Sequence, residues 1–393
     1  MQTLSDLAPT YRDGLLDDVL PFWIEHGIDR ECGGYLTSVD RDGTVIDTDK
    51  CIWQQGRFAW LLGELYNNVE PRDEWLELAR HGLDFIEKYA FDREGDGRMH
   101  FHVTRDGRPI RKRRYNFSES FAAIAFAEFA KATGSARHAD QAVRLFEEFV
   151  RYNTTPGAVP PKFTDVRPMK AMGFPMITIV TAQELREAIG YERANACIDR
   201  AIEEIRRDFV KPDLECVMEC VGPNGEVHDH FDGRTLNPGH AIEGAWFILR
   251  EAMHRDADPE LTALGTQMLD WMWQRGWDTE FGGLLYFRDL RNLPIQEYWH
   301  DMKFWWPQCE GLIATLLAWM LTGEDKYASW HRELHEWVHA RFPDRECGEW
   351  FGYLHRDGRL SVPLKGNMWK GPFHIPRMQL ICWQTLESGM EQS

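Results

Sequence analysis

Two histidines stand in closely similar surroundings although they lie far apart in the sequence. His240 follows Asn237-Pro238-Gly239 and His374 follows Gly371-Pro372-Phe373, so each stands where a helix is expected to begin. A single histidine beside proline and glycine is usually a capping or packing residue. Two in the same setting favour chemistry, because paired imidazoles can remove and return a proton near pH 7.

Other polar residues recur where apolar segments begin, at intervals of about sixty residues. Successive intervals are 62, 57, 64, 70 and 64 residues, from Arg57 through Glu119, Met176, His240 and Glu310 to His374. Parallel helices in a closed ring would bring these positions to one pocket. Arg57 and Glu310 could equally form only a buried ion pair, which is expensive without further hydrogen bonds. The partial positive charge of helix amino ends is expected to keep an adjacent imidazole neutral.

Tryptophans accompany these positions. The chain holds 17 tryptophans, and four of them lie near the polar helix starts: Trp53, Trp305, Trp306 and Trp369. Any one of them is most simply a core residue. Together they also suit stacking against the apolar face of a sugar ring.

An acidic turn repeats along the chain and predicts the elements that position these residues. Its copies begin at positions 29, 92, 153, 213, 278 and 344, and the strongest read Asp29-Arg30-Glu31-Cys32-Gly33-Gly34 and Asp278-Thr279-Glu280-Phe281-Gly282-Gly283. Each unit has room for an amphipathic helix such as 75–89 and a helix that is apolar nearly all round, such as 312–319. Half-exposed and enclosed helices in alternation predict one all-α domain over residues 1–393, an (α/α)6 barrel with short β-hairpins in its loops. An open solenoid of helix pairs is the alternative.

Composition excludes several classes of function. The net charge of -18 disfavours nucleic acid as a partner, and the basic run at 111–114 is expected to be a solvated loop, with a phosphate contact as the alternative. No segment approaches the roughly 20 apolar residues of a membrane span, and residues 1–6 lack a basic stretch before an apolar run, so we expect a cytoplasmic protein. The eight cysteines form no Cys-x-x-Cys pair, which argues against disulfides and zinc. His100-x-His102 and His228-x-His230 lie beside glycine-rich loops, and we expect no metal site there.

Four segments resemble the N-acylglucosamine 2-epimerase family, which also includes cellobiose 2-epimerases and mannose isomerases. They are 55–57, 237–243, 303–310 and 370–377, and the resemblance extends over nearly the whole chain. It implies an (α/α)6 barrel, no cofactor and a homodimer, with His240 and His374 as catalytic histidines, Arg57 as the essential arginine and Glu310 as the glutamate of the tenth helix. It also implies that Glu243, Trp306 and Trp369 line a sugar site. Relatives that act on disaccharides or mannose have a third histidine where this chain reads Phe174-Pro175-Met176, a departure that favours the acylglucosamine branch.

The reaction that the resemblance implies is inversion at C2 of a ring-opened sugar, N-acetylglucosamine to N-acetylmannosamine and back. One imidazole would remove the C2 proton while the other returns a proton to the opposite face, and Arg57 would stabilise negative charge on O1. Epimerisation or isomerisation of 2-hydroxy sugars, such as mannose, glucose or cellobiose, is the first alternative. An inverting glycoside hydrolase that uses two of Glu119, Glu243 and Glu310 is the second, and a protein-binding helical scaffold is the third.

Overall fold

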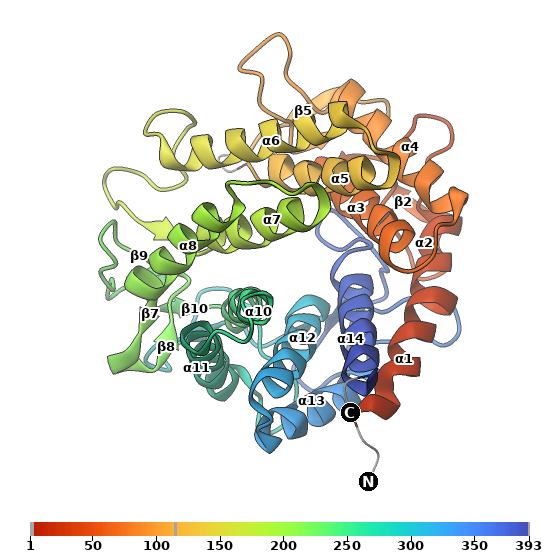
Figure 1. Cartoon of the computed structure of the whole chain (residues 1–393). Coiled ribbons are helices and arrows are strands. Elements are labelled where there is room, and N and C mark those ends of the chain that lie inside the picture. The colour runs from red at the N-terminus through yellow and green to blue at the C-terminus, as the bar shows by residue number, and fades with distance from the viewer. Residues whose placement is uncertain (1–3, 114–115, 392–393) are drawn as a thin grey trace.

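The computed structural model describes residues 4–113 and 116–391, so residues 1–3 of the amino terminus and Arg114 of the basic run lie outside the described part. Within it, two concentric rings of helices surround a central axis (Figure 1). The inner ring consists of α3 (Ile52–Asn68), α5 (Phe117–Thr133), α7 (Gly173–Ile189), α10 (Pro238–His254), α12 (Trp305–Thr322) and α14 (His374–Glu391). The sequence prediction of an (α/α)6 barrel is confirmed.

The outer ring is made of the amphipathic segments. Its first member is a composite of η1 (Ser5–Leu7), α1 (Ala8–Asp13), η2 (Gly14–Val19) and α2 (Leu20–His26). The others are α4 (Asp73–Tyr89), α6 (Ala136–Thr154), α8 (Ala194–Glu204) with η3 (Ile205–Phe209), α11 (Pro259–Gly276) and α13 (Asp325–His339). Two short turns, η4 (Pro212–Leu214) and α9 (Phe231–Arg234), lie outside the rings.

The pattern of apolar residues explains which helix lies in which ring. In α12 every residue from Trp305 to Ala318 is buried, so this helix must be enclosed by its neighbours. In α6 the buried residues fall on one stripe, Ala142, Leu145, Phe146 and Phe149, and the other face is polar. The first and last parts of the chain also meet, because α1 packs against α14. The helices therefore form a closed ring, and the open solenoid is excluded.

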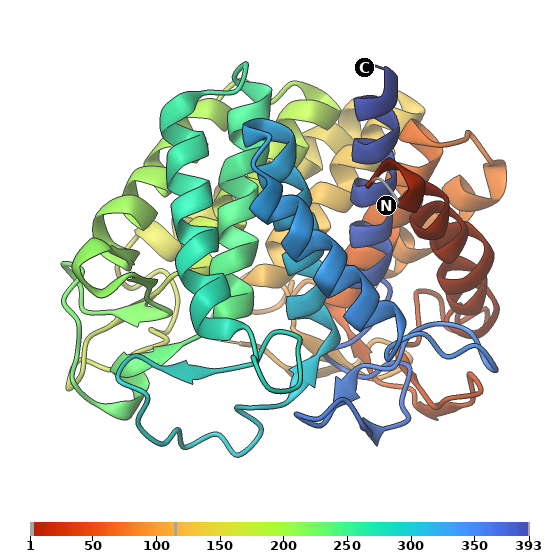
Figure 2. The same ribbon diagram turned by 90° about the horizontal axis from the view of Figure 1, so that it is seen from below.

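Short antiparallel strands gather at one end of the barrel, opposite the end where the described chain finishes (Figure 2). Two three-stranded sheets are β3 (Lys50–Cys51) with β4 (His102–Val103) and β5 (Pro109–Arg111), and β12 (Lys303–Phe304) with β13 (Tyr353–Leu354) and β14 (Leu360–Val362). The two-stranded pairs are β1 (Ser38–Val39) with β2 (Val45–Asp47), β6 (Lys170–Ala171) with β9 (Cys220–Val221), β7 (Val210–Lys211) with β8 (Cys216–Val217), and β10 (Thr235–Leu236) with β11 (Arg288–Asp289). Four of the eight pairings, β3–β4, β6–β9, β10–β11 and β12–β13, join neighbouring units and so fix the starts of inner helices.

The repeated acidic turn is a structural clamp. Asp29 is buried and accepts a hydrogen bond of 2.7 Å from the equally buried ammonium of Lys50, which also binds the carbonyl of Gly33 at 2.6 Å. Arg105, from the hairpin of the next unit, binds the same carboxylate with two hydrogen bonds of 2.8 and 2.9 Å. Although burial raises the pKa of Asp29, these partners together hold it below its usual value.

The same clamp recurs twice in the last units. Its members are Asp278 with Lys303 and Arg356, and Asp344 with Lys365 and Arg41. Arg41 belongs to the first unit and Asp344 to the last, so this clamp joins the two ends of the ring. The fourth copy of the turn departs from the sequence expectation. Asp213 is exposed, and Asp208, five residues earlier, instead accepts a hydrogen bond of 2.5 Å from the ammonium of Lys170.

Three expectations from composition can be compared with the described residues. No helix in them is long and apolar enough to span a bilayer. All eight cysteines are free thiols. The described part of the basic run is more ordered than the solvated loop that we expected, since Lys112 pairs with Asp92 and Asp96 and the guanidinium of Arg113 lies 4.7 Å from the ring centre of Phe101.

Candidate active site

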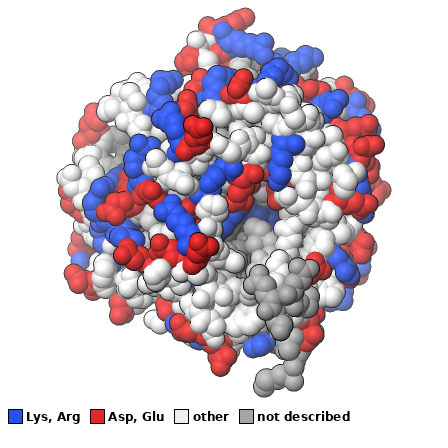
Figure 3. Space-filling model, in the orientation of Figure 1, with Lys and Arg blue, Asp and Glu red and all other residues white. Residues whose placement is uncertain are grey.

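A cavity of about 1970 Å³ occupies the barrel axis. His240, His374 and Arg57 line it at the hairpin end, and its walls reach Asn68 and Ser388, near the carboxyl ends of α3 and α14. Figure 3 looks onto that opposite face, which is hollowed near its centre and rimmed by charged side chains of both signs. The two histidines that the sequence singled out thus share one cavity, 134 residues apart in the chain.

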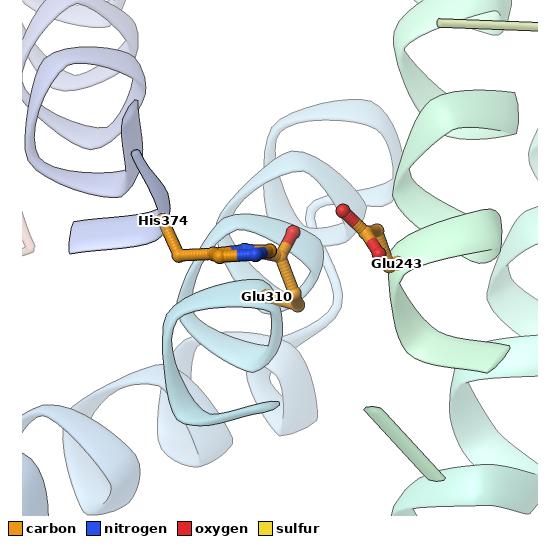
Figure 4. Close-up of side chains that lie close together, drawn as sticks. All are labelled: Glu243, Glu310 and His374. Atoms are coloured by element: carbon orange, nitrogen blue, oxygen red, sulfur yellow. The ribbon is translucent and has the colours of Figure 1, made fainter. Parts of the chain in front are cut away.

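His374 begins α14 and is held by a carboxylate behind it. Its Nδ1 donates a hydrogen bond of 2.7 Å to Glu310 of α12, because a carboxylate can only accept (Figure 4). Glu310 is fully buried and also accepts hydrogen bonds of 2.7 Å from Trp246 and from Arg377. This leaves Nε2 of His374 without its hydrogen and available as a base. Glu310 itself does not line the cavity, but its three hydrogen-bond partners, His374, Trp246 and Arg377, do.

The surroundings of His374 favour its neutral form. Burial, then the charges of Arg377 and Arg57, lower the pKa of His374 well below its usual value. The negative charge of Glu310 does not reverse this shift, because Arg377 already pairs with it and with Glu243 at 2.7 Å. His374 therefore agrees with the neutral imidazole expected at a helix amino end.

His240 departs from that expectation. It lies in the first turn of α10, where Asn237 accepts a hydrogen bond from its backbone N–H at 3.1 Å. Nδ1 of its ring lies 3.0 and 3.1 Å from the two carboxylate oxygens of Glu219. Burial alone would lower the pKa of His240, but the carboxylate of Glu219 outweighs burial and raises it. Glu219 thus favours the imidazolium form of His240, whereas burial favours the neutral form of His374.

Arg57 extends from α3 into the cavity between aromatic rings. Its guanidinium carbon lies 4.1 Å from the ring centre of Phe121, 4.6 Å from that of Phe373 and 4.7 Å from that of Trp53. It forms no ion pair with Glu310, which belongs to Arg377, so the ion-pair alternative from the sequence is wrong. Burial and then Arg377 lower the pKa of Arg57 to about 9, and its Nε has no hydrogen-bond partner. A buried cation in this state is suited to an anion in the cavity.

The predicted aromatic residues line the same cavity. The ring centre of Trp306 lies 4.9 Å from that of His240 and 5.9 Å from that of His374, so this indole touches both imidazoles. Trp53 and Trp369 meet edge to face, with ring centres 5.6 Å apart. Trp369 is 43% exposed, which places it where the cavity meets solvent at the hairpin end.

Glu119 does not belong to this group, although the sequence placed it there. Its Oε1 accepts a hydrogen bond of 3.0 Å from the backbone N–H of Met99, and it does not line the cavity. Gln55 and Gln308 hold the equivalent turns of their own units in the same way, each with hydrogen bonds from and to one backbone residue. Glu119 is thus the counterpart of these two glutamines.

The reason is a helical offset of two residues. Arg57 follows Gln55 by two positions, and the residue that follows Glu119 by two is Phe121, which lines the cavity. Two residues correspond to a rotation of about 200° around an α-helix, so Glu119 points away from the axis. An interval near sixty residues cannot detect such an offset.

Two functional candidates were missed by the sequence analysis. Glu219 lies in the short connection between β8 and β9, outside the periodic helix starts, and no spacing pointed to it. Arg377 stands three residues after His374, on the same face of α14, where an i, i+3 search around the histidine could have found it. It holds Glu243 and Glu310 together.

Among the described residues, two groups have the spacing of metal ligands, but only one lies at this site. Glu243, Glu310 and His374 offer ligand atoms within 4.8 Å of one another (Figure 4). The guanidinium of Arg377 already bridges the two carboxylates, so a cation would have to displace it. The second group, Glu64, Glu128 and Glu184, lies further along the cavity.

Comparison with known proteins agrees with this geometry. The family model for N-acylglucosamine 2-epimerase (GlcNAc 2-epimerase) matches residues 34–375. The chain belongs to this family. It is 36% identical to the N-acylglucosamine 2-epimerase of Bos taurus over 385 residues, which cover 95% of this chain and 90% of the bovine protein.

More distant members of the family share the fold. The cellobiose 2-epimerase of Dictyoglomus turgidum is 24% identical over 93% of this chain and 95% of that protein. The structure of cellobiose 2-epimerase from Spirochaeta thermophila superposes with a TM-score of 0.84 at 20% identity, covering 98% of each chain. As a member of this family, the chain is a carbohydrate 2-epimerase of the isomerase class.

Proposed function

We propose that this epimerase interconverts N-acetylglucosamine and N-acetylmannosamine, with His240 and His374 exchanging protons with C2 of the open-chain sugar. The observation that carries the proposal is the placement of the two imidazoles beside the same indole, Trp306, in one cavity, with pKa values shifted in opposite directions. The 36% identity to the bovine N-acylglucosamine 2-epimerase supports the choice of substrate.

The chemistry requires one proton to leave C2 and another to arrive. In the open-chain sugar, C1 is an aldehyde, which makes the C2–H bond acidic. Neutral His374 takes this proton at Nε2, and the electron pair moves to O1, where the guanidinium of Arg57 stabilises the enolate. The imidazolium of His240 then gives its proton to the opposite face of C2, and exchange with solvent resets both rings. The reverse reaction uses the same two groups with their roles exchanged.

The wall at the start of α7 supports a 2-acetamido substrate. Met176 stands near the position of the third histidine of the 2-hydroxy branch, lines the cavity and is 3% exposed. It lies beside Gly244, next to Glu243 of the site, where a Cβ would be 3.7 Å from its Cγ. An apolar thioether suits the methyl group of an acetamide better than it suits a hydroxyl.

A glycoside hydrolase needs two free carboxyl groups, and in the described part of the chain the three candidates Glu119, Glu243 and Glu310 all have hydrogen-bond donors bound to them. Inverting enzymes hold theirs about 6.5–9.5 Å apart to admit a water molecule. Glu243 and Glu310 have oxygens within 4.8 Å, and Arg377 binds both. Glu119 lies on another face of its helix. These contacts favour the epimerase.

A direct assay tests the proposal. The purified protein is incubated in deuterated water with N-acetylglucosamine, N-acetylmannosamine, glucose, mannose or cellobiose, and proton NMR follows the signal at C2. We expect interconversion of the two acetamido sugars, with deuterium appearing at C2. Faster turnover of mannose or cellobiose would instead support the 2-hydroxy alternative, and release of glucose from cellobiose would support a hydrolase.

We further propose that residues 1–393 form one catalytic domain that acts without a cofactor, as a homodimer in the cytoplasm. The continuous helical ring supports the single domain, and family resemblance supports the dimer. Dialysis against EDTA should leave turnover unchanged, and light scattering should give twice the 46.0 kDa chain mass. Loss of activity that is restored by a divalent cation would contradict the absence of a cofactor.

A further inference from the structure

We propose that Glu219 is a positioning residue for His240, holding the ring hydrogen on Nδ1 so that Nε2 faces the substrate. This inference rests on the proposed function. It adds a residue that no helix-start pattern identifies and gives the two histidines distinct partners, Glu219 for one and Glu310 for the other.

The contact geometry defines the tautomer. Both oxygens of Glu219 point at Nδ1 of His240, at 3.1 and 3.0 Å. The side-chain amide nitrogen of Asn237 also lies 3.1 Å from Nδ1, but the two oxygens of Glu219 can only accept hydrogen bonds and carry the charge. We therefore assign the hydrogen to Nδ1, which makes Nε2 the exchangeable position. The imidazole of His240 also packs on Trp306, with ring centres 4.9 Å apart. Carboxylate and indole together hold the ring in one orientation.

The backbone around Glu219 is fixed from two directions. Its carbonyl accepts a hydrogen bond of 3.0 Å from the N–H of Met172, at the start of α7. The residues on either side are held as well, since Met218 donates to Phe209 at 2.9 Å and Cys220 pairs with Ala171 between β9 and β6. The carboxylate is thus built into the wall of the barrel, as expected of a group that must place another within a fraction of an ångström.

The charges facing the two histidines differ in sign. Glu219 and Glu243 face His240 and stabilise its cation, and Lys162, from the segment between α6 and α7, opposes them. Arg377 and Arg57 face His374 and disfavour its cation, with Glu243 acting in the other direction. A proton can be taken at one ring and given at the other only if the two rest in different states, and Glu219 supplies that difference at His240.

The test compares Glu219→Gln with Glu215→Gln. The first variant keeps the shape of the side chain and removes its charge, and the second makes the same change at an exposed position of the neighbouring β7–β8 turn. For Glu219→Gln we expect kcat to fall about 10- to 100-fold, less than the loss of a complete acid–base group. The alkaline limb of the kcat/KM profile should move to lower pH, because burial still lowers the pKa of His240 while the opposing charge is gone. Glu215→Gln should match the parent.

A second readout separates positioning from a structural effect. In deuterated water, Glu219→Gln should lose C2 exchange mainly from the epimer whose proton His240 removes, as His240→Asn does, and retain it with the other. Equal loss with both epimers, or an unshifted pH profile, would overturn the role of Glu219. Glu219→Asp, which restores the charge on a shorter stem, should recover the alkaline limb even if kcat stays low.

Failure of the inference and failure of the proposed function are distinguishable. His240→Asn and His374→Asn should each retain C2 exchange with a different epimer. If they do not, the two-histidine mechanism itself is wrong. If they do, but Glu219→Gln does not lose exchange with the same epimer as His240→Asn, only the positioning role of Glu219 is wrong.

Discussion

At the scale of one residue, Arg57 is a buried cation that no anion among the described side chains neutralises directly, which is unfavourable until a substrate binds. Its guanidinium is enclosed by Trp53, Phe121 and Phe373, its Nε has no partner, and its pKa is lowered to about 9. Among the described residues no carboxylate pairs with it directly, since Arg377 binds both nearby acids, Glu243 and Glu310. A substrate that develops negative charge would supply the missing partner.

This state predicts that Arg57→Met separates activity from stability. Methionine fills the aromatic enclosure without a charge, so the melting temperature should stay the same or rise, as when a buried ion is replaced by an apolar residue. The value of kcat should fall about 10²–10³-fold, the usual effect of removing one donor to a developing oxyanion. Steady-state kinetics and thermal melts check both. A variant that kept kcat within threefold would show that Arg57 does not stabilise the transition state.

For Glu119 we expect the opposite result, an effect on stability and none on activity. Its carboxylate accepts the N–H of Met99, and burial raises its pKa to about 7. Glu119→Gln should keep both kcat and stability, because the amide oxygen still accepts, as Gln55 and Gln308 do in their units. Glu119→Ala should cost about 1–3 kcal/mol of unfolding free energy by leaving that N–H unpaired. Urea unfolding and turnover measure the two effects, and a large fall of kcat in Glu119→Gln would return this residue to the site.

At the scale of elements, the outer helix α13 carries a buried row of histidines. The hydroxyl of Tyr11 from α1 joins two of them, lying 2.9 Å from Nε2 of His331 and 2.8 Å from Nδ1 of His335. Nδ1 of His331 lies 3.0 Å from the carbonyl of Leu312, so it carries a hydrogen and its Nε2 accepts from Tyr11. Tyr11 in turn accepts from His335. The chain of hydrogen bonds therefore requires a neutral ring at His331, and burial favours neutral rings at His335 and His339.

These neutral rings predict a loss of stability in mild acid. Burial lowers the pKa of His331 and of His339 to about 4, and that of His335 still further. Between about pH 6.5 and pH 4 the unfolded chain binds protons that the folded chain refuses, so the unfolding free energy falls as pH falls, by about 1.4 kcal/mol per unit for each histidine. Urea unfolding at pH 7 and pH 5 should show a smaller change in His335→Gln than in the parent. Equal changes in both proteins would contradict neutral burial.

The elements also show what sequence periodicity can and cannot reveal. Both histidines, Arg57 and Glu310 were predicted because inner helices begin at regular intervals and their first turns converge. Glu119 was misplaced because an interval near sixty does not determine which face of the helix a residue occupies. Glu219 was missed because it lies in the connection between β8 and β9, whose position depends on the pairing of β6 with β9 rather than on any period.

At the scale of the whole molecule, the acidic turns explain why the fold could be predicted. The turn requires glycine where its backbone adopts positive φ angles, at Gly33, Gly34, Gly282 and Gly283. These glycines make the repeated turn recognisable in the sequence. Asp29, Asp278 and Asp344 can also be recognised in the sequence, because each binds a buried lysine. Closure of the ring was only an inference from the repeat, since the partner of Asp344 is Arg41, more than 300 residues away.

The clamp between first and last units predicts a graded loss of stability. Lys365→Met should cost about 3–5 kcal/mol, because it leaves the carboxylate of Asp344 buried without its nearest ammonium. Arg41→Ala should cost less, about 1 kcal/mol, because Arg41 is 40% exposed and Lys365 remains. Arg105→Ala, which breaks the same contact between adjacent units, is the matched control. If Arg41→Ala and Lys365→Met both unfold like the parent, the clamp does not hold the ring closed.

The proposed mechanism requires that the two imidazoles exchange protons with opposite faces of one carbon, and C2 exchange measures this directly. His240→Asn and His374→Asn are each incubated in deuterated water with N-acetylglucosamine or N-acetylmannosamine, and deuterium at C2 is followed by proton NMR. Neither variant should interconvert the sugars, and each should retain exchange with one epimer only, the two variants with opposite ones. Retention with the same epimer in both variants, or epimerisation by either, would contradict the account.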